Sequence, residues 1–282
     1  MMYYLMITLS ALIFALQFML NAGYQKESGS GWDSSLKLSL YSSIVGFIAL
    51  FVINGFKLRI SIFSLVVALV YSMVCILLNY STVKSLKHAN LSVYSIFSMI
   101  GGMILPFVYG LLCGEEFKVI RILCCILISV SVAMNAGKGY NSKKAFKYYM
   151  AVFILNGMVG VISKFHQSYP DYCVDSADFL MISKIMTALL SVILIALTNK
   201  KDFSVSIKAL GYSAGSAVLN SVANLLLLIA LLNLPASVQY PIVTGGVIVF
   251  STLIDIVRKT KLKKREIIAS LIAFAASAFM AL

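Results

Sequence analysis

The residues best suited to recognise a solute are amides, hydroxyls and phenols that interrupt long apolar runs. Within a run they recur at intervals of three or four, which places them on one face of a helix. Asn220 and Asn224 follow this spacing, and Asn156 and Ser163 lie seven residues apart on one helical face. Uncharged donors and acceptors on such faces suit a small polar solute. We therefore predict a substrate site formed by Gln17, Asn79, Tyr94, Ser98, Asn156, Asn220, Asn224, Gln239, Tyr240 and Thr244.

Basic groups lie close to two of these runs. Lys164 and His166 are near the end of one run, and Lys184 is about two helical turns into the next. Their charge would attract a carboxylate or phosphate into a vestibule of the site. The alternative, which we favour, is that the two lysines extend outward to water and pair with acidic residues of the segment 171–178.

The same polar groups also have a purely structural interpretation. Ser, Asn and Gln often join membrane helices through hydrogen bonds worth roughly 0.6–2 kcal/mol each. The glycine pairs at 101–102 and 245–246 are expected to be points of close helix packing, and Pro106 and Pro241 to bend their helices. From the sequence, a solute cavity and hydrogen-bonded helix contacts both remain open.

The composition identifies the elements that carry these residues. Of 282 residues, 61% are apolar and 12% charged, against about 25% charged in a soluble domain. This excludes a soluble globular enzyme, a disordered chain and a disulfide scaffold; the five Cys mostly fall in apolar runs, where they are expected to pack. We predict an all-α integral membrane protein with ten transmembrane helices of about 20 residues, at 2–22, 36–55, 61–80, 91–112, 119–136, 148–168, 178–198, 208–232, 236–257 and 266–282.

The charge distribution predicts an orientation. The net charge is +13. Of the 23 Lys and Arg residues, 17 lie on the side of the membrane that holds the loops after the odd-numbered spans. The positive-inside rule places these loops in the cytoplasm and both termini outside. The basic residues are then expected to face the lipid headgroups of a plasma membrane. We do not expect them to bind nucleic acid. The first run lacks a preceding charged segment and is expected to be a retained span.

A polar linker at 138–147 divides the chain into units of five spans each, 1–137 and 148–282. An odd number of spans inverts the second unit relative to the first, which is the plan of many secondary transporters. The third and eighth spans carry similar polar series: Ser72, Cys75 and Asn79 in one, and Ser216, Asn220 and Asn224 in the other. We expect spans one, three, four, six, eight and nine to line a central cavity.

Short motifs near the repeat-related loops resemble a known family. They are the segment 85–93 followed by Gly114-Glu115-Glu116, and the segments 230–237 and 240–243 followed by Arg265-Glu266. They are similar to the turn between the third and fourth helices, and to the Gly-Glu before the fifth, in the ten-helix EamA-type branch of the drug/metabolite transporter (DMT) superfamily. The resemblance covers essentially the whole chain and implies two inverted EamA-like repeats around a cavity. The expected outer termini and the long basic loop before the last span depart from the family.

These observations predict a secondary-active or facilitative transporter of a small polar metabolite, namely an amino acid, a sugar or nucleoside, or an amine. No acid lies near the middle of a span; Glu115, Glu116, Asp255 and Glu266 lie at span ends, where we expect water to keep them ionised. This disfavours the alternative of a multidrug or cation exporter. A non-transporting membrane scaffold is the other alternative.

The sequence gives little support for a soluble catalytic site. It has no phosphate-binding Gly-rich loop, no His-Glu-x-x-His and no Cys-x-x-Cys. Its one Gly-x-Ser-x-Gly, at 211–215, falls inside the predicted span 208–232 and not at the strand-to-helix turn that this motif requires. We therefore expect no enzyme activity, no cofactor and no metal, and a monomer or homodimer whose partners are its solute and the bilayer.

Overall fold

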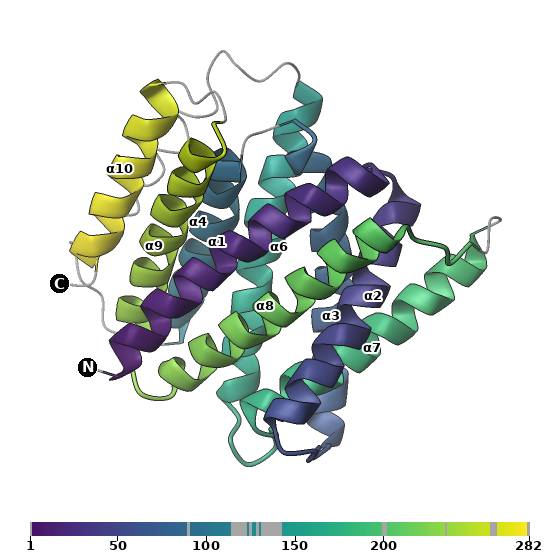
Figure 1. Cartoon of the computed structure of the whole chain (residues 1–282). Helices are drawn as coiled ribbons and strands as arrows, with labels where there is room; N and C mark the ends of the chain where they lie inside the picture. Colours follow the sequence, from purple (N-terminus) through teal and green to yellow (C-terminus); the bar gives the residue numbers. More distant parts are fainter. Residues whose placement is uncertain are drawn as a thin grey trace.

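The computed structural model describes residues 2–88, 91–113, 123, 126, 127, 130, 143–198, 202–234, 236–259 and 264–280. Regular structure in these residues is entirely helical. The helices, shown in Figure 1, are α1 (Met2–Ser28), α2 (Trp32–Ile53), α3 (Ile62–Leu86), α4 (Leu91–Leu112), α6 (Lys143–Gln167), α7 (Ser176–Leu197), α8 (Ile207–Leu231), α9 (Ala236–Val257) and α10 (Lys264–Met280). The fifth predicted span, 119–136, lies almost wholly outside the described residues.

Several helices are longer than their apolar runs. Helix α1 continues to Ser28 and α3 to Leu86, whereas the apolar patterns end at 22 and 80. Helix α6 begins at Lys143, inside the range 138–147 that was expected to be a linker. An apolar run indicates only the part of a helix that faces hydrocarbon, and the backbone hydrogen bonds continue into the polar headgroup region. The predicted bounds of α4 and α9 agree with the structure.

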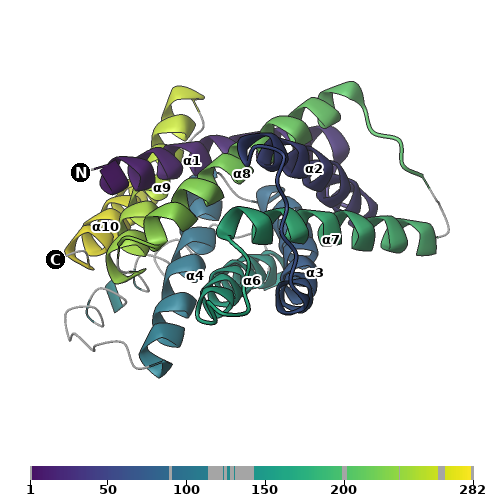
Figure 2. The ribbon, with the colours of Figure 1, turned by 90° about the horizontal axis from the view of Figure 1, so that it is seen from below.

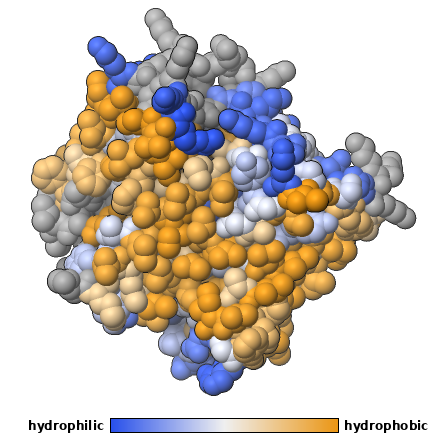
Figure 3. Space-filling view, in the orientation of Figure 1, coloured by the Kyte–Doolittle hydropathy of each residue, from blue (hydrophilic) through white to orange (hydrophobic). Residues whose placement is uncertain are grey.

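The exterior of the helix bundle is apolar. Seven described helices are long and apolar enough to cross a membrane, which indicates an integral membrane protein. Large side chains such as Ile48, Val66 and Ile193 are about half exposed on these helices. Figure 3 shows apolar residues forming a broad band across one face, with hydrophilic residues gathered beyond it. Such a surface is unfavourable in water and suits lipid chains.

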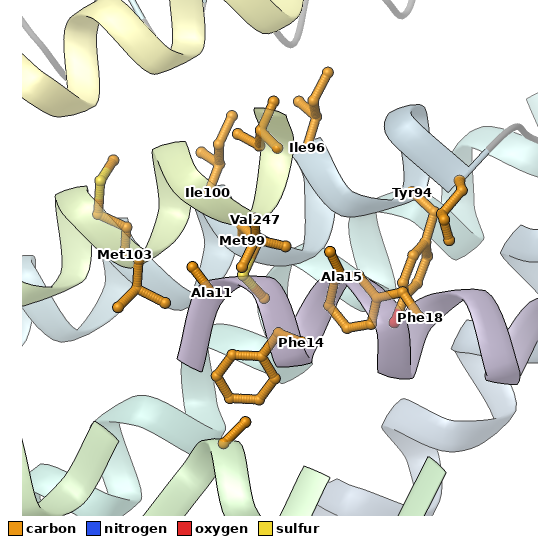
Figure 4. Packing of buried hydrophobic residues seen from close by; sticks show 14 of the residues in the cluster. Ala11, Phe14, Ala15, Phe18, Tyr94, Ile96, Met99, Ile100, Met103 and Val247 are labelled. Carbon is orange, nitrogen blue, oxygen red and sulfur yellow. The ribbon is translucent and has the colours of Figure 1, made fainter. Parts of the chain in front are cut away.

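The helices pack side by side in a recurring set of pairs (Figures 1 and 2). Helix α1 packs on α8 and α9, α4 on α6 and α9, and α2 on α7 and α8. Helix α3 packs on α6 and α7, and α10 packs on α9. The largest apolar cluster includes Phe14 and Phe18 of α1, Met99 of α4 and Val247 of α9 (Figure 4).

Contacts between loops define two ends of the bundle. At the basic end, Lys37 Nζ lies 2.7 Å from Asp202 Oδ2, and Ser206 Oγ lies 3.1 Å from Glu27 Oε1. The hydrogen bond from Lys37 holds the pKa of Asp202 well below its usual range. At the opposite end, Asn54 Nδ2 donates to Asp178 Oδ1 at 3.0 Å. Helix α2 therefore runs in the opposite direction to α1, and α8 runs in the opposite direction to α7.

Glycine permits the closest helix contact. A Cβ at Gly101 of α4 would lie 1.9 Å from the carbonyl oxygen of Phe153 on α6, so that only glycine fits there. On α9, a Cβ at Gly246 would lie 2.9 Å from Ala11 Cβ on α1. Gly101 is thus a packing point as predicted, whereas its neighbour Gly102 lines the cavity described below.

Candidate functional site

A cavity of about 180 Å³ lies at the centre of the bundle. On the same measure one water molecule needs roughly 10–15 Å³, so this space holds on the order of a dozen waters or a small metabolite. Residues from α1, α2, α3, α4, α6, α7, α8 and α9 line it. The six expected helices are among these, and α2 and α7 are additional.

Most of the predicted substrate residues lie on this cavity. The structure places the following on its wall: Gln17, Asn79, Tyr94, Ser98, Asn156, Asn220, Asn224, Tyr240 and Thr244. Two of these amides, those of Asn79 and Asn156, are held by neighbouring helices. Asn79 Nδ2 donates to Ser39 Oγ at 2.9 Å, and Asn156 Nδ2 donates to the carbonyl oxygen of Ser98 at 2.7 Å. These hydrogen bonds fix the orientation of each amide at the wall.

Gln239 is the exception, and its predicted place in the cavity is wrong. Its side chain is fully buried, and Nε2 donates to the carbonyl oxygen of Leu227 at 2.7 Å. This bond joins the start of α9 to the end of α8, so Gln239 acts as a helix contact.

A chain of polar groups joins α1 to α8 along one wall. Gln17 Nε2 donates to Ser216 Oγ at 3.4 Å, and Ser216 Oγ donates to Asn21 Oδ1 at 2.6 Å. Gln17 Oε1 is buried and has no hydrogen-bond partner among the described residues. Asn21 and Ser216 also line the cavity, although the predicted site omitted them. Both belong to series of polar residues that recur on one helical face and can be seen in the sequence.

Tyr94 contributes a phenol at the junction of α3, α4 and α1. Its hydroxyl oxygen lies 3.1 Å from Thr82 Oγ1, and its ring packs edge-on against Phe18 with centroids 4.9 Å apart. Across the cavity wall, Thr244 Oγ1 donates to the carbonyl oxygen of Met99 at 3.3 Å. Helices α4 and α9 thus both contribute residues with hydroxyl groups to the cavity wall.

Lys184 lies in the cavity wall rather than in an outer vestibule. Its Nζ donates to Asn220 Oδ1 at 3.3 Å. Among the described lining residues it is the only one with a formal charge. The expectation that Lys184 extends outward to loop acids is therefore wrong. A Cβ at Gly46 on α2 would lie 3.2 Å from Lys184 Cε, so the glycine leaves room for the lysine stem to run between α2 and α7.

The other two vestibule candidates do not reach the cavity. His166 is 1% exposed, and its Nε2 lies 2.8 Å from Ser64 Oγ. Its ring stacks on Phe179, with centroids 4.0 Å apart, and on Phe63. Lys164 is half-buried near the opposite end and is not among the lining residues. The vestibule prediction for His166 is wrong because aromatic packing on α3 and α7 encloses the ring.

Helices α2 and α7 supply hydroxyl groups that the predicted site missed. Ser43 on α2 and Ser183 and Thr187 on α7 line the cavity. A signal was present, because Ser39, Ser43 and Gly46 recur at intervals of four and three. It was overlooked because the prediction weighted amides and the resemblance between the two halves.

Cys75 also lines the cavity and is half-buried, although its mid-run position predicted simple packing. Asp255 departs from expectation as well. It is 2% exposed rather than in contact with water, and it does not line the cavity. Glu115 and Glu116 lie outside the described residues. Within the described part of the chain, no three His, Cys, Asp or Glu residues gather as metal ligands would.

Comparison with known proteins establishes the class of fold alone. No protein-family model and no curated protein matches the sequence. A solved crystal structure, described only as that of a protein, has a similar fold: the TM-score is 0.61, and 96% of each chain is covered. The two sequences are 13% identical, so the likeness extends to the arrangement of helices and not to activity.

Proposed function

We propose that this chain is a secondary-active or facilitative transporter of a small polar metabolite that works by alternating access around the central cavity. We further propose that it is a ten-helix EamA-type member of the DMT superfamily. The observation that carries the proposal is a polar cavity, lined by eight described helices, inside a bundle whose exterior is apolar. Polar residues at membrane depth are costly unless they line such a site.

The helix contacts support two inverted repeats of five helices. If α1–α4 correspond to α6–α9, the α1–α8 contact exchanges with α6–α3, and α4–α6 with α9–α1. The α3–α7 contact likewise exchanges with α8–α2, while α2–α7 and α4–α9 map onto themselves. A two-fold axis in the membrane plane produces this pattern, with the solute site on the axis.

The proposed orientation places the basic end in the cytoplasm, both termini outside and the protein in the plasma membrane. Lys84 and Lys147 lie at this end beside tyrosines; Lys84 Nζ is 5.6 Å from the ring centroid of Tyr80, and Lys147 Nζ is 5.2 Å from that of Tyr148. Tyrosine and lysine are both enriched where helices meet headgroups, and cytoplasmic loops carry the excess of lysine.

A scaffold with a closed, hydrogen-bonded interior is the main competing function. The cavity volume favours the transporter, because helix contacts alone would bring the walls together. A cation exporter is disfavoured, since the described wall contains Lys184 and no acid.

A thermal-shift screen of the purified protein tests the proposal. A ligand that binds only the folded state raises the melting temperature, so at least one amino acid, carboxylate, sugar, nucleoside or amine should do so. The shift should be lost in Asn156→Ala, because that amide lies on the cavity wall. The matched control is Asn233→Ala, whose exposed amide donates to the carbonyl oxygen of Ile229 away from the cavity. Shifts that survive Asn156→Ala and every other cavity substitution would contradict the proposal.

A further inference from the structure

The cavity has one formal charge among its described lining residues, and that charge is positive. Lys184 Nζ donates to Asn220 Oδ1, an uncharged acceptor. The described ion pairs Lys37–Asp202 and Arg59–Asp175 do not include Lys184. An ammonium inside a membrane protein is unfavourable without a counter-charge, and a bound anion would provide one.

We propose that the cavity binds a small anion, a solute with a carboxylate or phosphate group whose charge is held by Lys184. This inference rests on the proposed transport function and narrows its substrate class. A solute of this kind would meet the ammonium at the cavity wall, and a cationic solute would be repelled there.

The neighbouring groups suit the oxygens of an anion. A lysine ammonium has three N–H donors, and one of them is directed at Asn220. Ser183, the preceding residue, also lines the cavity, and its buried hydroxyl has no hydrogen-bond partner among the described residues. Ammonium and hydroxyl donors together form strong, charge-assisted hydrogen bonds to a carboxylate or phosphate.

The inward path of Lys184 is built into the helix packing. Its Cδ and Cε would lie 3.4 and 3.2 Å from a Cβ at Gly46, and the same Cβ would lie 2.9 Å from Ser221 Oγ. The lysine stem therefore occupies space that any side chain at Gly46 would take. A lysine two turns into a helix has the reach to extend to an interface, yet this one is held where α2, α7 and α8 meet.

Cys75, a native cysteine, lies on the same cavity wall. Its reaction with charged reagents reports the sign of the electrostatic potential in the cavity. The full-length protein is prepared with Cys113, Cys124, Cys125 and Cys173 replaced by Ser. Cys75 is then modified by an anionic reagent, 2-sulfonatoethyl methanethiosulfonate, and by a cationic one, 2-(trimethylammonium)ethyl methanethiosulfonate. The ratio of the two rates cancels the fraction of thiolate, because both reagents attack the same thiolate. It therefore reports the local potential.

We expect the anionic-to-cationic rate ratio to fall about tenfold or more in Lys184→Met and to be retained in Lys184→Arg. Lys208→Met, which removes an exposed lysine outside the cavity, should leave the ratio unchanged. An equal ratio in the native protein and in both Lys184→Met and Lys184→Gln would overturn the anion site and leave the transport proposal standing. Failure of both reagents to reach Cys75 in the folded protein would overturn the water-filled cavity, and with it both proposals.

Matched solutes identify the kind of anion. Glutarate is compared with glutaramide, and glycerol phosphate with glycerol, by the rise in melting temperature of the native protein and of Lys184→Met. A rise caused by a charged member alone, and lost in Lys184→Met, assigns the carboxylate or the phosphate class. A rise caused equally by the uncharged member, and kept in Lys184→Met, would overturn the inference.

Discussion

The stem of Lys184 lies against Gly46, so that a Cβ on the glycine would be 3.2 Å from Lys184 Cε. This contact joins α7 to α2 and directs the only formal charge of the described cavity wall inward. Helix α2 has no amide at the cavity. It shapes the site because Gly46, which has no side chain, leaves room for the stem of Lys184.

Gly46→Ala is expected to displace the Lys184 ammonium without unfolding the protein. The added methyl group meets the ends of two flexible side chains, Lys184 and Ser221, so the stability cost should be about 1 kcal/mol. The anionic-to-cationic rate ratio for modification of Cys75 should fall. Adding Ser221→Ala removes the 2.9 Å contact. An effect that persists in the double variant belongs to Lys184, and full recovery would assign it to the serine.

Gly101→Ala is expected to separate α4 from α6. The new Cβ would lie 1.9 Å from the carbonyl oxygen of Phe153, and backbone cannot move aside as a side chain does. We expect a loss of at least about 3 kcal/mol of unfolding free energy, at the upper end of overpacking effects. Gly211→Ala on α8 is the control, since nothing lies within 4 Å of its Cβ position. Melting temperatures that fall equally in both variants would contradict the close packing of α4 on α6.

Ser64→Ala is expected to loosen the opposite end of the bundle. The Ser64 hydroxyl lies 2.8 Å from His166 Nε2 and accepts from the backbone N–H of Val174 at 3.1 Å. Removing it leaves both groups unsatisfied, at a cost of about 1–3 kcal/mol. Ser168→Ala, which deletes an exposed hydroxyl bonded to the Lys164 carbonyl oxygen, should have little effect on the melting temperature. Equal melting temperatures of the two variants would show that the Ser64 contacts contribute nothing.

The Lys37–Asp202 pair predicts a small pH-dependent contribution to stability. Hydrogen bonds from Lys37 and Ser204 lower the pKa of Asp202 below its ordinary value of 3.8. A carboxyl whose pKa is lowered by folding stabilises the protein above the unfolded value, and this is lost as pH falls toward the folded value. Asp202→Asn should therefore lower the melting temperature slightly at neutral pH. The difference should shrink below pH 3.8, and also in high salt because the Asp202 carboxylate is exposed to solvent. A difference that grows on acidification would contradict this pairing.

The helices were predictable because each apolar run reflects a local requirement of the bilayer, met by about 20 consecutive residues. The stripes of Asn220 and Asn224 were predictable for a similar reason, since helical spacing is local. The path of Lys184 was not, because it depends on Gly46, a residue distant in sequence on another helix. Gln239 carries the same amide as Gln17, yet it contacts the carbonyl of Leu227, and only the packing of α8 on α9 decides this.

Solute counterflow tests the central claim, transport through the cavity, most directly. Proteoliposomes are loaded with the metabolite that raises the melting temperature, and entry of the labelled metabolite is followed with no pH gradient. We predict a transient accumulation of label that is abolished in Asn156→Ala and retained in Asn233→Ala, because the first amide lies on the cavity wall and the second does not. A metabolite that raises the melting temperature but is never exchanged would contradict the account and identify a binding protein that does not transport.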